Sequence, residues 1–181
     1  MIYGERVRLR RIERADLPHL VEWLNDPEIR RHLAFVYPLS LTEEDDWYAA
    51  TLKLEPAARP FAIEARVGAS AAEEWTLLGS TGYHAIDWRQ RSGEPGIFVG
   101  RKDVWGRGFG TDAFRALVRW GVDELNLNRI WVRVYEDNVR AIRCYEKIGF
   151  RLEGRLRQDR YEGGRYLDTL VMGLLRSELG S

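Results

Sequence analysis

The chain has 181 residues, of which 45% are hydrophobic and 31% charged, as expected of one globular domain spanning residues 1–181. Its 28 basic and 28 acidic residues balance, so the composition does not support nucleic-acid binding through an overall positive field. A single cysteine, charges from Glu5 onward and no apolar run near the ~20 residues that cross a bilayer predict a cytoplasmic protein without disulfides, signal peptide or membrane segment.

Hydrophobic periodicity assigns helices and strands to the first half of the chain. Val7–Arg10 alternates as a strand does, and Ala15–Asn25 carries apolar residues on one helical face. Ser40 and Glu43 have the spacing of a capping box, which predicts a second helix running to about Leu54. Strands are predicted next, with a polar turn at 89–93 before the last of them: Phe61–Arg66, Trp75–Trp88 and Gly96–Val99.

The second half of the chain has clearer periodicity. Apolar residues recur at helical spacing over Thr111–Leu125, and Arg129–Tyr135 alternates as a strand. A helix is predicted over Asn138–Ile148, ending at Gly149, where a glycine commonly follows the last helical residue. Two strands close the chain around a glycine-rich turn, Phe150–Tyr161 and Arg165–Arg176. This order of elements predicts a mixed sheet in one α/β domain.

A glycine stands at every second position of Gly106-Arg107-Gly108-Phe109-Gly110-Thr111, directly before the Thr111–Leu125 helix. Glycine removes the Cβ where a ligand touches the backbone, and the first turn of a helix offers unpaired N–H groups and a positive dipole end. The spacing therefore predicts a pyrophosphate site, with a simple glycine-rich turn as the alternative. The loop matches neither of two common nucleotide-binding motifs. Thr111 stands where a dinucleotide fingerprint needs its third glycine, and the loop has no P-loop lysine.

A second segment downstream completes a pattern with this loop. Its residues match Asn-x-x-Ala-x-x-x-Tyr-x-x-x-Gly-Phe, with Asn138, Ala141, Tyr145, Gly149 and Phe150 in register. Together the two segments resemble the GNAT superfamily of acyl-CoA-dependent N-acetyltransferases. The segments at 23–28 and 159–168, and the aromatic residue before the loop where many members have Gln or Arg, resemble the RimJ/RimL and spermidine acetyltransferase branch. The resemblance implies a single-domain α/β GNAT-like fold with a mixed, mostly antiparallel seven-stranded sheet flanked by helices.

The resemblance also implies acetyl-CoA as cosubstrate and no metal. The loop would bind the pyrophosphate, and the strand at 97–99 would bond the pantetheine arm where it splays from the Arg129–Tyr135 strand. The residues implied to bind the cosubstrate are Phe98, Val99, Gly100, Trp105, Gly106, Arg107, Gly108, Phe109, Gly110, Thr111, Asn138, Ala141 and Tyr145. For Asn138 a helix N-cap is the alternative, and one residue can serve both roles.

Tyr145 is the candidate proton donor. Acyl transfer from a thioester expels a thiolate, whose thiol has a pKa of ~8.5. A phenol, with a pKa of ~10, is still protonated at neutral pH and can hand over its proton as the thiolate forms. The alternative is a core aromatic in an apolar helical row. The attacking amine must lose a proton to Glu94, to Asp87 or to water, and either carboxylate could instead be an exposed turn residue. Cys144, beside the tyrosine, is interpreted as a packing residue.

The sequence thus predicts a cytoplasmic acetyl-CoA-dependent N-acetyltransferase that works by direct attack in a ternary complex. Its acceptor would be a primary amine of a protein N-terminus, a polyamine or another small amine. The alternative is a non-catalytic acyl-CoA-binding sensor or interaction module of the same fold. The acidic run from Glu43 to Asp46 either attracts a polycation or compensates a helix dipole. No nucleic acid or membrane partner is predicted, and a homodimer is compatible with the sequence, which does not fix the oligomeric state.

Overall fold

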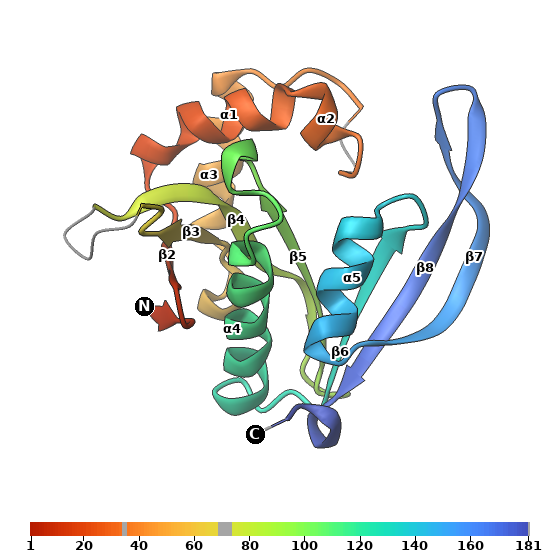
Figure 1. Ribbon diagram of the computed structural model, residues 1–181. Coiled ribbons are helices and arrows are strands. Elements are labelled where there is room, and N and C mark those ends of the chain that lie inside the picture. Colours follow the sequence, from red (N-terminus) through yellow and green to blue (C-terminus); the bar gives the residue numbers. More distant parts are fainter. Residues whose placement is uncertain (34–35, 69–73, 181) are drawn as a thin grey trace. The chain divides into compact units, whose positions relative to one another are not determined.

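The structure is a computed structural model that describes residues 1–33, 36–68 and 74–180 (Figure 1). The strands are β1 (Ile2–Tyr3), β2 (Val7–Arg11), β3 (Phe61–Ala65), β4 (Thr76–Asp87), β5 (Ser92–Val99), β6 (Arg129–Tyr135), β7 (Arg151–Glu162) and β8 (Arg165–Leu175). The α-helices are α1 (Leu17–Asn25), α2 (Pro27–Arg30), α3 (Leu41–Thr51), α4 (Phe109–Asp123) and α5 (Val139–Ile148). Short 3-10 helices are η1 (Arg14–Asp16), η2 (Pro56–Ala58), η3 (Lys102–Val104) and η4 (Arg176–Glu178). None of the helices in these ranges is long and apolar enough to cross a membrane.

The chain divides into two compact units. Unit 1 comprises Met1–Tyr83 and Ile97–Leu117, and unit 2 comprises His84–Gly96 and the chain from Val118 onward. The described residues form a mixed sheet of eight strands in the order β1-β2-β3-β4-β5-β6-β8-β7. The predicted α/β fold with a mixed sheet and flanking helices is therefore confirmed, but the expected count of seven strands is wrong by one. The extra strand β1 has only two residues, too few for an alternating pattern to be visible in the sequence.

Unit 1 contains an antiparallel meander from β1 to β4. The predicted capping box forms at the start of α3, where the Ser40 hydroxyl accepts from the Glu43 N–H at 3.2 Å and the Glu43 carboxylate accepts from the Ser40 N–H at 2.8 Å. The helix ends at Thr51, earlier than predicted. One buried cluster joins α1 to the sheet, with partly buried side chains packed around it: Ile12, Leu17, Leu20 and Ala62, surrounded by Trp23, Tyr48, Leu77 and Phe98.

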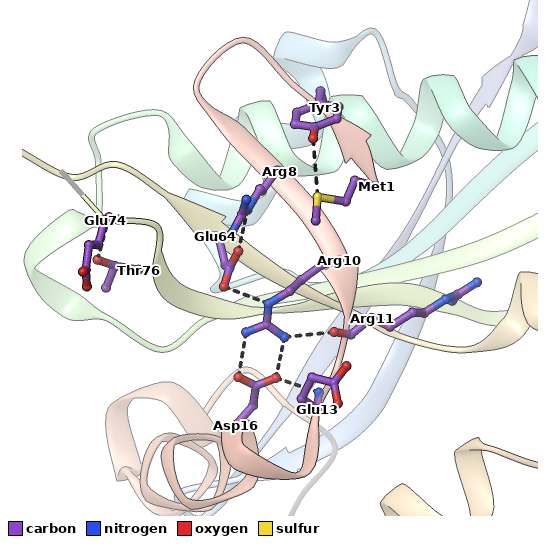
Figure 2. Close-up of polar contacts among 10 residues, drawn as sticks. All are labelled: Met1, Tyr3, Arg8, Arg10, Arg11, Glu13, Asp16, Glu64, Glu74 and Thr76. Carbon is purple, nitrogen blue, oxygen red and sulfur yellow. Dashed lines mark hydrogen bonds and ion pairs between the residues drawn. The ribbon is translucent and has the colours of Figure 1, made fainter. Parts of the chain in front are cut away.

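An ion network ties β2 to β3 and to η1 (Figure 2). The Glu64 carboxylate accepts from Arg8 Nε at 2.6 Å and from Arg10 Nε at 2.8 Å. The remaining guanidinium nitrogens of Arg10 donate to both oxygens of Asp16, at 2.7 and 2.8 Å. Asp16 also accepts from the backbone N–H of Glu13 at 2.8 Å, which holds the entry to α1. Both carboxylates are buried, at 6% and 7% exposure, so the network stabilises the fold only while it is complete.

The Asp16–Arg10 pair should make unit 1 sensitive to acid. Burial alone would raise the pKa of Asp16, but hydrogen bonds from Arg10 and from Glu13 N–H outweigh it and lower the pKa. The pair therefore contributes stability above the unfolded-state pKa, and this contribution is lost as the pH falls through the folded-state pKa. Asp16→Asn is expected to cost roughly 2 kcal/mol of unfolding free energy at pH 7 and to remove this acid dependence.

Urea unfolding at pH 7 and pH 3 measures this effect. Asp45→Asn is the matched control, because its ion pair with Arg14, at 3.2 Å, lies on the surface and should be worth less than about 1 kcal/mol. Equal losses of stability for the two variants would contradict the assignment.

Unit 2 is organised around β6. It pairs antiparallel with β8 along its whole length, and β8 pairs with β7 in the long twisted hairpin drawn in blue in Figure 1. The hairpin turns at Gly163 and Gly164, whose φ angles of 58° and 84° are left-handed. Strand β5 runs parallel to β6, but their ladder contains only Ser92↔Arg129 and Gly93↔Ile130. Residues Glu94–Gly96 of β5, which also belong to unit 2, are not paired with β6.

Two predicted boundaries in and around this unit need correction. The strand expected at Gly96–Val99 already begins at Ser92, inside the stretch interpreted as a polar turn. The turn itself is marked by the positive φ of Arg91, 52°. Helix α4 begins at Phe109, two residues before the predicted start. Helix α5 matches its prediction, with Asn138 as N-cap and Gly149 at φ 113° after its last turn.

Candidate active site

The glycine loop lies in unit 1, between η3 and α4. Gly106 and Gly108 have φ angles of 75° and 89°, a conformation that residues with a Cβ rarely adopt. A Cβ added at Gly106 would have no atom of the described chain within 4 Å, and one at Gly108 would meet only Arg6, at 3.9 Å. The two glycines are thus required by the backbone, and the loop presents an open surface above them.

The first turn of α4 leaves a set of backbone donors unpaired. The Asp112 N–H bonds the carbonyl of Gly108 at 3.0 Å and closes the first turn. No described residue accepts a hydrogen bond from the N–H groups of Gly108, Phe109, Gly110 or Thr111. Unpaired N–H groups at the positive end of a helix, here one of 15 residues, are donors of the kind that bind anions such as a pyrophosphate.

The N-terminal segment of the chain holds this loop. The Asp112 carboxylate accepts from three consecutive backbone N–H groups, residues 5–7, at 3.0, 2.7 and 3.2 Å. The Arg6 guanidinium lies 4.0 Å from the centroid of the Phe109 ring and donates to the Arg107 carbonyl at 2.9 Å. Sequence reasoning missed both contributors. An acidic residue in the first turn was a usable signal for Asp112, whereas no motif marks Arg6.

Other contacts explain residues that were predicted to bind the cosubstrate. The Trp105 indole N–H donates to the Val99 carbonyl at 2.8 Å, which joins the loop to the end of β5. Gly100 has a packing reason of its own, since an added Cβ would lie 2.0 Å from the ring of Trp23. Its N–H also bonds the Leu78 carbonyl at 2.8 Å. Trp105 and Gly100 therefore anchor the loop, and their contact with a cosubstrate stays a prediction.

The remaining predicted residues of unit 1 surround the same segment. Phe98 is half-buried against the cluster that joins α1 to the sheet. The guanidinium of Arg107 lies 5.4 Å from the Phe109 ring centroid and donates to the Val67 carbonyl at 2.9 Å. At Gly110 an added Cβ would meet the Val99 side chain at 3.3 Å, so the glycine permits close packing of α4 against β5.

Unit 2 holds Asn138, Ala141 and Tyr145 on α5. The Asn138 side-chain oxygen accepts from the Ala141 N–H at 3.2 Å, which is an N-cap. The Asn138 amide nitrogen donates to no residue that the structure describes, so capping leaves a donor available for a ligand. Tyr145 follows seven residues later on the same helical face and is 6% exposed, with its ring centroid 5.7 Å from that of Phe150.

The phenol of Tyr145 is held in its protonated form. Burial raises its pKa well above the ordinary value, and the neighbouring Cys144 adds to the shift. The group therefore keeps its proton at neutral pH. Burial and the ring contact also satisfy the alternative role of a core aromatic, so kinetics must separate the two.

The two candidate bases differ in their surroundings. Glu94, on β5, is mostly buried, and its two oxygens accept from Nε and NH2 of Arg133 at 2.8 and 3.2 Å. Asp87, at the end of β4, is exposed and accepts from the Gln90 N–H at 2.8 Å, as a turn carboxylate does. Glu94 is thus positioned by Arg133, a partner that sequence reasoning did not identify, whereas Asp87 is a solvent-exposed turn residue.

The structure thus brings the predicted residues together in two sets. Unit 1 carries the loop, Trp105 and the end of β5, and unit 2 carries Glu94 and the α5 residues.

Comparisons with known proteins show what the whole chain is similar to. The model of the acetyltransferase (GNAT) domain matches residues 6–151. The uncharacterized N-acetyltransferase p20 of Bacillus licheniformis is 30% identical over 179 residues, covering 98% of this chain and 97% of its own. The spermidine N(1)-acetyltransferase of Vibrio cholerae is 28% identical over 176 residues, covering 97% and 96%. The crystal structure of spermidine N-acetyltransferase from Vibrio cholerae, in complex with CoA and spermine, has a TM-score of 0.83 at 28% identity and covers 97% of this chain and 98% of its own.

Proposed function

The chain belongs to the GNAT acetyltransferase family and is an acetyl-CoA-dependent N-acetyltransferase, and we propose that its acceptor is a primary amine of a polyamine or a similar small amine. Spermidine acetyltransferases stand among its relatives at full length, which supports this acceptor class. We further propose that the amine attacks the thioester directly within a ternary complex. We also propose that residues 1–181 form one N-acetyltransferase domain of the RimJ/RimL-like branch and that the protein is cytoplasmic.

The observation that carries the cosubstrate assignment is the glycine loop. Its left-handed glycines, its open surface and the unpaired N–H groups at the start of α4 fit a pyrophosphate. Acetyl-CoA, when bound, supplies the activated acetyl group. Unit 1 would bind its pyrophosphate, and the amide nitrogen of Asn138 offers a further donor in unit 2.

Residues of unit 2 would handle the protons. Tyr145 holds the proton that the departing thiolate needs, and its buried phenol keeps that proton until the thiolate forms. Glu94, held by Arg133, is the proposed acceptor of the proton that the amine must lose.

An acceptor screen tests the function. Thiol release from acetyl-CoA would be followed with spermidine, an aminoglycoside and a peptide with a free N-terminus. We expect the highest kcat/KM with spermidine. A peptide that reacts fastest would assign the protein to N-terminal acetylation, and no thiol release with any amine would favour a non-catalytic sensor of acyl-CoA.

Glu94→Gln is expected to lower kcat/KM by about 10²-fold at pH 6.5 and by less at pH 9, because the amine is chiefly protonated at low pH and then depends most on a base. Initial rates across this pH range measure the effect. Glu153→Gln is the matched control, since it removes another bidentate pair with an arginine of β6, Arg129. Parallel pH profiles for Glu94→Gln and the parent would transfer the role to Asp87 or to water.

A further inference from the structure

The acidic run at the start of α3 separates into groups with different surroundings. Glu43 completes the capping box with Ser40. Asp45 pairs with Arg14 at 3.2 Å, and Asp46 is exposed to solvent. Three of the four carboxylates are thus either paired or hydrated, and none of the three is unusual for the first turns of a helix.

Glu44 is different. It is 4% exposed, and no residue that the structure describes gives its carboxylate a hydrogen bond or an ion pair. It lies on the one buried face of α3, with Tyr48 one turn and Thr51 two turns further along. The hydroxyl of Thr51 donates to the Tyr48 carbonyl at 2.7 Å, so it is not a donor to Glu44.

A buried carboxylate without a partner is costly in its ionised form. Burial raises the pKa of Glu44 to about 7, because it penalises the charged form. A cation bound beside the carboxylate would remove this penalty. A cation that carries N–H donors matches the carboxylate best, because it both neutralises the charge and donates to a group that only accepts hydrogen bonds.

The neighbours of Glu44 connect it to the predicted cosubstrate strand. Tyr48, on the same face of α3, packs on the buried cluster of unit 1, and Phe98 of β5 packs on that cluster too. The inner face of α3 and the strand assigned to the pantetheine arm therefore belong to one packed core of unit 1.

We propose that Glu44 binds an ammonium group of the acceptor, and that this ammonium is not the nitrogen that becomes acetylated. The second clause follows from the chemistry: the attacking nitrogen must be neutral, whereas the nitrogen that neutralises the Glu44 carboxylate carries a positive charge. Preferred acceptors are therefore diamines and polyamines rather than monoamines. This inference rests on the proposed function, because it assumes that an amine is the acceptor.

The test compares acceptors that differ only in their second nitrogen. Steady-state kinetics would be measured with 1,4-diaminobutane and with butylamine for the parent, Glu44→Gln and Asp46→Asn. The parent should prefer the diamine at least tenfold in kcat/KM. Glu44→Gln should raise KM for the diamine at least tenfold, leave KM for acetyl-CoA unchanged and leave butylamine turnover within twofold. Asp46→Asn removes the same charge from the exposed side of the same helix and should behave as the parent.

A binding measurement separates this inference from the proposed function. Calorimetric titration of spermidine into CoA-saturated protein should show at least tenfold weaker binding for Glu44→Gln, with partial recovery in Glu44→Asp. Thermal melts should show no loss of stability in Glu44→Gln, since it removes an unpaired buried carboxylate. If the parent acetylates no amine but binds spermidine through Glu44, the proposed function fails and the cation site stands. Equal spermidine affinity for the parent and Glu44→Gln would overturn the inference. It would also be overturned if Glu44→Gln lost diamine and butylamine turnover equally and had a lower melting temperature.

Discussion

Replacing Tyr145 by Phe is expected to lower kcat by about 10²–10⁴-fold while acetyl-CoA affinity changes little. Phe keeps the ring and its contact with Phe150 but deletes the proton that the leaving thiolate needs. The loss should therefore appear in the chemical step, in single-turnover rates as well as in kcat. Calorimetric titration with CoA would confirm that binding survives.

Tyr83→Phe is the matched control for this experiment. Tyr83 is 3% exposed, its pKa is also raised by burial, and its hydroxyl donates to the Leu117 carbonyl at 3.4 Å. Tyr83→Phe therefore removes a buried hydroxyl that has no proposed catalytic role. A purely structural Tyr145 predicts near-parent kcat for Tyr145→Phe and a lower melting temperature for Tyr145→Ala. That result would leave solvent to protonate the thiolate.

Gly108→Val is expected to weaken acetyl-CoA binding at least tenfold, about 1.4 kcal/mol, while the fold survives. At φ 89° a β-branched residue is strained by about 1–3 kcal/mol, and relief of that strain moves the N–H groups that the pyrophosphate would contact. Isothermal titration of CoA into the folded variant measures the loss.

Gly164→Val provides the control for strain, because Gly164 has a similar φ of 84° in the β7–β8 turn. It should lose comparable stability and keep its acetyl-CoA affinity. Unchanged affinity in a folded Gly108→Val protein would remove the loop from the pyrophosphate site.

Elements with strong local signals were predictable from the sequence. Helix α5 has an Asn cap, an apolar row and a C-terminal glycine, and its prediction was right to the residue at its end. Strand β6 alternates and was also right. By contrast, β1 and the start of β5 exist because a partner strand pairs with them, and such pairing leaves no local pattern.

The candidate site divides in the same way. The glycine loop and Asn138 could be found because backbone conformation and capping act locally. The contacts of Asp112 with the N-terminal segment join residues more than 100 positions apart, and the Arg133–Glu94 pair joins residues 39 positions apart. The burial of Glu44 was equally invisible, since the acidic residues of that run look alike in sequence but point to different sides of one helix.

The side-chain oxygen and nitrogen of Asn138 have different roles. Its oxygen starts α5, while its nitrogen is unused by the described protein. Asp or Ser would cap the helix as well, but neither offers an amide N–H. Selection for folding alone would therefore let this position drift among Asn, Asp and Ser, and selection for a ligand would confine it to Asn. In a related chain, the residue at the position of Asn138 therefore indicates whether ligand binding or only helix capping has been retained.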